Sequence, residues 1–260
     1  MDKDDLLNLV NDPNLIPGIY NYCDQWCERC TFTKRCANFA INEKRNSERG
    51  ELDISNKEFW KELESVFKLT LDMLLEAAQN EGIDLNAIDY TVYEKTINEL
   101  DIIAENSPCS SMSKDYIDMV EAFFETAEST FKEWKDEQIK MYELGISGVD
   151  AERNVEKLSS LIEVISWYRY QIHVKINRAL MGKLEDEDVD FSKDSDGSAK
   201  VALIGIDRSI SAYGKILLLF PQLEDELLKI LIHLEKLRKV MEKGFPEARS
   251  FIRPGFDEIK

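Results

Sequence analysis

Four of the five cysteines of the chain fall within fourteen residues, and they are the sharpest chemical signal in the sequence. They are Cys23, Cys27, Cys30 and Cys36, in the spacing C-x3-C-x2-C-x5-C. Thiolates bind zinc and iron strongly, and four of them complete either a tetrahedral zinc site or the four corners of a 4Fe–4S cluster. The spacing therefore predicts that these four sulfurs converge on one inorganic centre.

The compactness of the segment favours an iron–sulfur cluster over zinc. Structural zinc sites usually take their ligands from two short-gap pairs with a long spacer between them, whereas Cys27 and Cys30 form the one such pair here. Iron–sulfur loops are often compact. Zinc stays open as the alternative, because four thiolates around either centre leave a net negative charge that the same neighbours would offset.

Basic and aromatic residues among the cysteines suit a centre of either kind. The basic residues are Arg29, Lys34 and Arg35, and the aromatic ones are Tyr20, Tyr22, Trp26, Phe32 and Phe39. We expect the basic side chains to offset the thiolate charge by hydrogen bonds and Coulomb attraction. We expect the aromatic side chains to form an apolar shell that limits the access of water.

Two partial resemblances involve this segment. Cys27, Cys30 and Cys36, with Phe32 between them, resemble the C-x2-C-x-aromatic-x3-C end of the iron–sulfur staple in RecB-type exonucleases, over about ten residues. That resemblance implies a cluster; the carboxylate–lysine core of the nuclease is not recognisable elsewhere in the sequence. Cys23, Cys27 and Cys30 match the triad of radical S-adenosylmethionine enzymes, but Cys36 would fill the iron that those enzymes leave open, and no repeated strand–helix pattern follows.

The composition limits the partners and the compartment. Lysine and arginine number 33 against 51 aspartates and glutamates, which gives a net charge of −18. Such a charge disfavours nucleic acid and anionic membranes as partners. The acidic amino end has no secretory signal, and the longest apolar run, 216–220, is too short to cross a bilayer. We therefore expect a cytoplasmic protein with reduced thiols, no membrane or nucleic-acid partner, and a redox partner protein if the centre transfers electrons.

The rest of the sequence predicts an all-α fold, a bundle of about six helices with the cysteine loop packed on one end. Apolar residues recur at three- and four-residue steps, which is the pattern of amphipathic helices. After a short helix at 37–45, the expected helices span about 56–81, 90–105, 113–145, 151–183, 198–220 and 222–243. We expect a segment boundary near residue 46, with the cysteine loop in 1–46 and the bundle in 47–260.

A second candidate site lies on the helix expected at 151–183. Glu163, Tyr170 and His173 fall on one polar stripe of that helix, together with Ser166 and Asn177. With Asp207 from the polar stripe of a neighbouring helix, they are our candidates for a cofactor-binding pocket, in which His173 would carry protons. The alternative is that the stripe marks the boundary between core and solvent.

Two other features are interpreted as structural. Cys109 is interpreted as a lone thiol, with a fifth ligand or a redox partner of the cluster as the alternative. Glu121, Glu125 and Glu128 are interpreted as a solvated helix face, because no Glu-x-x-His pattern accompanies them. Two classes of function remain. One is a cluster-bearing redox or electron-transfer protein, and the other is a non-catalytic interaction module with a structural zinc site.

Overall fold

The computed structural model describes residues 7–9, 11–48, 57–87, 90–145, 150–185 and 192–257, and these residues are helical, with no strand among them. The prediction of an all-α fold is confirmed. The expected number of about six helices is too low, because the described part of the chain contains α2 to α8 and five short 3-10 helices. The short turns were missed because a single 3-10 turn leaves no periodic pattern in the sequence.

The chain divides into two compact units, each described by itself. One unit contains residues 1–97 and 253–260, and the other contains residues 98–252. The division expected at residue 46 stays a prediction. The polar stretches 47–56 and 184–196 favour linkers, but residues 47–48, 184–185 and 192–196 are helical, and the residues between them lie outside the described part of the chain. No described helix is both long enough and apolar enough to cross a bilayer.

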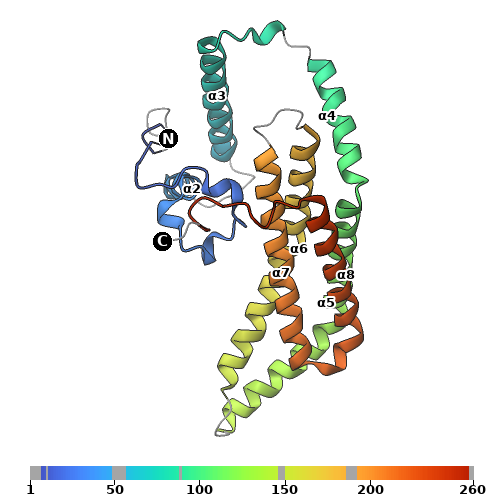
Figure 1. Ribbon diagram of the computed structural model, residues 1–260. Coiled ribbons are helices and arrows are strands. Elements are labelled where there is room, and N and C mark those ends of the chain that lie inside the picture. The colour runs from blue at the N-terminus through green and yellow to red at the C-terminus, as the bar shows by residue number, and fades with distance from the viewer. Residues whose placement is uncertain are drawn as a thin grey trace. The chain divides into compact units, whose positions relative to one another are not determined.

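The larger unit is a bundle of four long helices (Figure 1). They are α5 (Pro108–Glu143), α6 (Ala151–Glu185), α7 (Ser192–Leu219) and α8 (Glu224–Gly244), with the 3-10 turn η5 (Pro221–Leu223) between the last two. Helix α6 packs on α5 and α7, and α8 packs on the same two helices, so each helix has two neighbours. The apolar stripes read from the sequence form the core. Its fully buried members include Tyr116, Leu158, Ile165, Tyr168, Ile172, Leu203, Ile206, Leu227 and Leu234.

Local sequence explains where α5 begins. Ser107 caps the helix by accepting a hydrogen bond from the backbone N–H of Ser110, at 3.2 Å, and Pro108 occupies the first helical position. Proline suits that position because its missing N–H would have no partner there. The apolar pattern of the sequence predicts a start near residue 113. The helix starts earlier because the Ser-Pro pair initiates it.

The close crossing of α6 and α7 depends on four small residues that share one face of α7. Ala202, Gly205, Ser209 and Ala212 are all buried. A Cβ atom at Gly205 would lie 2.9 Å from Cδ1 of Tyr168, so nothing larger than glycine fits without displacing the tyrosine ring. Small residues let the two helix axes approach closely.

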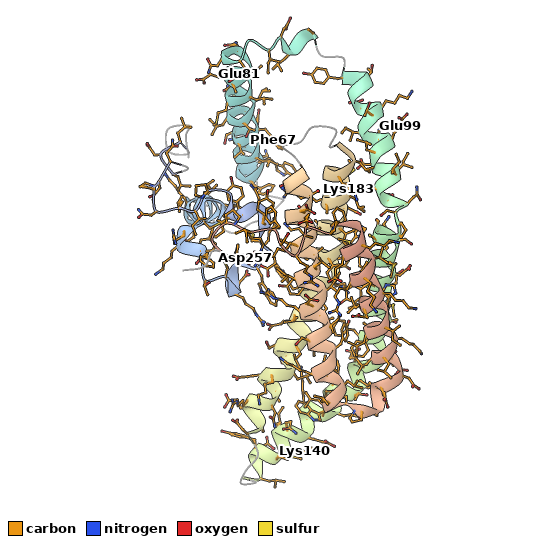
Figure 2. All side chains as sticks on the ribbon, in the orientation of Figure 1. Phe67, Glu81, Glu99, Lys140, Lys183 and Asp257 are labelled. Carbon is orange, nitrogen blue, oxygen red and sulfur yellow. The ribbon has the colours of Figure 1, made fainter. Side chains whose placement is uncertain are left out.

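The smaller unit holds the cysteines. Its described elements are η1 (Ile19–Tyr22), η2 (Cys27–Arg29), η3 (Thr33–Arg35), α2 (Ala37–Glu48), α3 (Lys57–Asn80) and η4 (Leu85–Ala87). Helix α4 (Tyr90–Glu105) contains the boundary between the two units. On α3, the apolar side chains of Phe67, Leu71 and Leu74 are more than half exposed; Phe67 is labelled in Figure 2.

Candidate metal centre

Three consecutive 3-10 turns place the cysteines at the ends of short elements. Cys23 follows η1, Cys27 and Cys30 bracket η2, and Cys36 follows η3. Between the first two cysteines Gln25 has a φ of 56°, in the left-handed region that non-glycine residues rarely adopt. The chain therefore turns several times within a short length, and a cysteine lies at the end of each turn. Residues 19–39 are called the cysteine module below.

All four cysteines of the module line one pocket. The other residues of its wall include Ile19, Tyr20, Trp26, Phe32, Phe39 and Phe256. The pocket is narrow, because the space open to the centre of a water molecule is about 20 Å³, which is room for roughly one water. The four thiols therefore surround a small, mostly apolar hollow and are half-buried around it.

The thiols do not close on a single point. Among the described residues, no group of three or more His, Cys, Asp or Glu side chains is arranged to hold one metal ion. Cysteine side chains rotate between three staggered positions about χ1. A metal centre in the pocket therefore requires rotation of at least some thiols from the positions they have here.

The thiols lie within reach of one another's electric fields. Burial raises the pKa of the Cys27 thiol above its ordinary value, and the charges of Cys23, Cys36 and Cys30 raise it further. Four thiolates in one pocket repel each other unless a cation lies between them. Metal binding would remove that repulsion, because a metal ion replaces the protons of its thiol ligands.

Two backbone features would stabilise thiolates in the pocket. The backbone N–H of Phe32 donates to Sγ of Cys30 at 3.4 Å. The carbonyl of Cys36 accepts from the N–H of Ala40 at 3.0 Å, which places Cys36 at the amino end of α2. Hydrogen bonds to sulfur and the positive end of a helix both favour the charged form of a thiol. Cys23 instead donates its thiol hydrogen to the carbonyl of Tyr20, at 3.4 Å, and would give up that bond as a thiolate.

The basic residues of the module lie around the pocket and do not line it. Arg29 stacks on the ring of Trp26, with its guanidinium carbon 4.1 Å from the ring centroid. Arg35 donates from Nε to the carbonyl of Asn14 at 3.2 Å, and its own carbonyl accepts from the N–H of Ile16 at 2.9 Å. Arg35 thus ties the preceding segment to the module. The hydrogen bonds and Coulomb attraction expected between the basic side chains and the thiolates stay a prediction.

The aromatic shell has one member that sequence reasoning missed. Of the five expected aromatic residues, Tyr22 does not line the pocket, and Phe256 completes it from the far end of the chain. The ring of Phe256 lies edge-on to Phe32, with centroids 5.0 Å apart. The sequence predicts only an irregular tail after residue 244. No local spacing links a residue in it to cysteines so far away in sequence.

The contacts described for the candidate residues of the second site are made with different partners. His173 lies between Ser113 on α5 and Asn177 on its own helix, with Nδ1 2.8 Å from Oγ of the serine and Nε2 3.1 Å from the amide nitrogen. Burial lowers its pKa below the ordinary value, and Lys114 lowers it further. Tyr170 donates to Glu121 on α5 at 3.0 Å.

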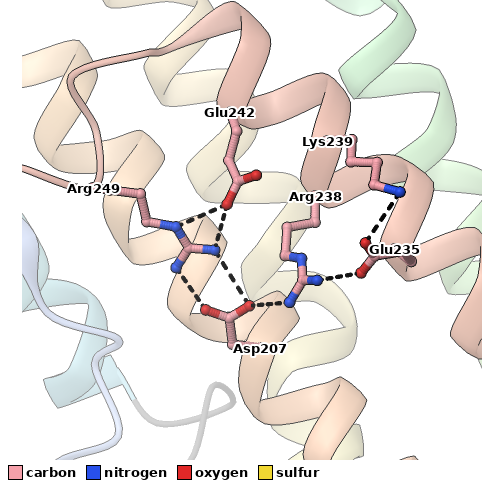
Figure 3. A network of polar contacts seen from close by, with 6 residues as sticks. All are labelled: Asp207, Glu235, Arg238, Lys239, Glu242 and Arg249. Carbon is pink, nitrogen blue, oxygen red and sulfur yellow. Dashed lines mark hydrogen bonds and ion pairs between the residues drawn. The ribbon is translucent and has the colours of Figure 1, made fainter.

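Asp207 belongs to a network of ion pairs (Figure 3). Its carboxylate accepts from Arg249 at 2.6 Å and from Arg238 at 3.3 Å. Glu242 binds the same Arg249 at 2.8 Å. The network ties the segment after α8 to α7 and α8, which gives Asp207 a structural role. Glu163, the fourth candidate, is exposed on α6.

The three glutamates of α5 line an open groove of about 810 Å³ beside α6. Lys132, Lys135 and Arg169 line the same groove. Because cations lie among the carboxylates, the groove has the mixed charge of a solvated helix face. Cys109 is 6% exposed in the other unit from the cysteine module, and burial raises its pKa.

Comparison of the chain with family models, with curated proteins and with solved structures finds no match. The residues of the cysteine module are therefore the main indication of function.

Proposed function

We propose that the cysteine module binds an iron–sulfur cluster of the 4Fe–4S type through Cys23, Cys27, Cys30 and Cys36, and that the protein has a redox or electron-transfer role. The observation that carries the proposal is that all four sulfurs line one pocket. Its apolar wall would limit access of water to the cluster, and the hydrogen bond to Cys30 and the helix end at Cys36 would stabilise bound thiolates.

The distribution of the thiols supports a cluster over a single ion. A zinc ion holds each sulfur at about 2.3 Å, so its four ligands must crowd around one point. A cubane cluster binds one thiolate at each of four separate irons, so its ligands stand further apart. The four cysteines reach one pocket from the ends of separate short turns, which suits the second arrangement.

The narrowness of the pocket favours the alternative, a structural zinc site in a non-catalytic module. A hollow of about 20 Å³ accepts one ion with small movements of the thiols, whereas a cluster must push the aromatic walls apart. In this function the metal would fasten the short turns of the module together. Small segments without a large apolar core often need such a metal for stability.

Analysis of the protein purified without oxygen distinguishes the two functions. Iron and acid-labile sulfide in equal amounts, with broad visible absorbance that bleaches on reduction, are expected for the cluster. Zinc without visible colour would instead support the structural zinc site. A protein with neither metal, even after reconstitution with iron and sulfide or with zinc, would overturn both.

A further inference from the structure

We infer that residues 253–257 are a part of the metal centre, a docked segment whose Phe256 shields the bound metal from water; this inference rests on the proposed function. The segment lies in the same compact unit as the cysteine module, although most of the chain separates them in sequence. Figure 1 shows the red carboxyl-terminal stretch ending among the blue amino-terminal turns, and Asp257 is labelled there in Figure 2.

Phe256 forms one wall of the cysteine pocket. It lines the pocket together with all four cysteines, and its ring meets Phe32 at an interplanar angle of 73°, the edge-to-face geometry that aromatic pairs favour. The pocket is narrow, so removal of this one ring would open a substantial part of the wall. Solvent exposure is one of the properties that set the stability and potential of a bound cluster.

The segment is held in a fixed turn by its own contacts. The guanidinium of Arg253 binds the carboxylate of Asp257 through two hydrogen bonds of 2.9 and 3.0 Å, and these side chains are 15% and 20% exposed. The backbone N–H of Arg253 donates to the same carboxylate at 3.1 Å. The guanidinium carbon also lies 4.8 Å from the ring centroid of Phe256. The paired charges thus hold the aromatic ring in one orientation.

Because residue 255 is glycine, the turn packs closely against Ile16, which precedes the cysteine module, and Ile19, its first residue. Gly255 has a φ of +76°, and a Cβ atom there would lie 2.8 Å from Cδ1 of Ile16 and 3.1 Å from Cδ1 of Ile19. Both isoleucines are buried, Ile19 to 2% exposure. Any other residue would meet both an unfavourable backbone conformation and a clash. The contact is therefore shaped for docking of this segment.

Docking and metal binding are coupled if Phe256 covers the metal. A docked segment then slows metal loss, and by linkage the bound metal favours the docked segment. Two measurements follow, one on the metal and one on the segment. The first is the rate at which the loaded protein loses its metal to a chelator under anaerobic conditions. The second is the rate at which chymotrypsin cleaves after Phe256, compared between loaded and metal-free protein.

The variants Phe256→Ala and Gly255→Ala test the inference in the full-length protein. The first variant removes the aromatic ring. The second undocks the segment but keeps the phenylalanine in the chain. We expect both to load metal and to lose it faster, on the order of tenfold, the effect typical of residues that surround a metal's ligands. Phe256→Leu should retain most of the protection. Tyr142→Ala, a largely exposed aromatic residue of the other unit, is the matched control and should behave as wild type.

The outcomes separate the inference from the proposed function. Metal loss at the wild-type rate in both variants, together with cleavage after Phe256 that does not depend on metal, overturns the role of the segment and leaves the metal centre standing. Absence of metal from the wild-type protein refutes both. A variant that fails to load is compared with wild type by circular dichroism. If its helix content is unchanged, the failure supports the segment's part in the site, and otherwise Phe256→Leu and the cleavage assay decide.

Discussion

His173 on α6 and His233 on α8 contact consecutive residues of α5. Nδ1 of His173 lies 2.8 Å from Oγ of Ser113, and Nε2 of His233 lies 2.7 Å from the carbonyl of Met112. These are the two histidines of the chain. They connect both neighbours of α5 to a single turn of that helix. The polar stripe that suggested a proton-transfer site therefore includes a contact between helices.

The stability of the bundle should fall as the solution is acidified below neutrality. Burial lowers the pKa of His173. Lys114 lowers this pKa further, and Glu105, which pairs with Lys114 at 3.6 Å, raises it by less. The unfolded chain then binds more protons than the folded one between the folded pKa and the ordinary value of about 6.5, so stability is full above that value and declines as pH falls through this window.

Urea unfolding at a series of pH values between neutrality and mild acid measures this effect. His173→Gln should reduce the slope of stability against pH in that window, because glutamine does not titrate. An identical slope in His173→Gln and wild type would show that other groups cause the pH dependence.

Each of the four pocket cysteines should be required for metal binding. Replacement of Cys23, Cys27, Cys30 or Cys36 by serine removes a thiolate ligand, so the metal content of the purified protein should fall well below that of wild type. Cys109→Ser removes the fifth cysteine, which is buried in the other unit, and should leave the metal content unchanged. Full metal content in all four pocket variants would show that these cysteines do not bind the metal.

The local sequence predicted the features that depend on local spacing. The period of three and four residues predicts the long helices because burial of one face requires it. The short gaps between the cysteines keep them close together along the chain, and the convergence of their sulfurs on one inorganic centre stays a prediction. The wall formed by Phe256 and the salt bridges of Asp207 depend on contacts between distant segments, which no local pattern encodes. The sequence does not show that Arg249 returns to Asp207, and a role of Asp207 in a pocket stays a prediction.

The network around Asp207 should stabilise the larger unit. Asp207→Ala removes the shared partner of Arg238 and Arg249, two side chains that are 32% and 41% exposed. We expect a loss of about 1 kcal/mol in the free energy of unfolding, the upper end for partly exposed pairs that act as a network. Lys239→Ala is the control, because Lys239 is 71% exposed and pairs with Glu235 at the edge of the network. Equal urea midpoints for the two variants would contradict a central role for Asp207.

Two glycines of α7 should respond in opposite directions to the same substitution. In Gly205→Ala the new methyl group would lie 2.9 Å from the ring of Tyr168 and 3.0 Å from Ile172. Because both neighbours are buried and cannot move freely, we expect a loss of about 1–3 kcal/mol, typical of overpacked cores. At Gly214 nothing lies within 4 Å of the position of the new methyl group. There alanine should stabilise the helix by about 0.5–1 kcal/mol, because it restricts the unfolded chain.

Thermal and urea unfolding of the two alanine variants, side by side with wild type, measure this contrast. Both substitutions add one methyl group to the same helix and raise its intrinsic propensity equally. The difference between them therefore reports the packing of α6 on α7 alone. If Gly205→Ala were as stable as Gly214→Ala, the ring of Tyr168 would have room to move, and the close crossing would not depend on glycine.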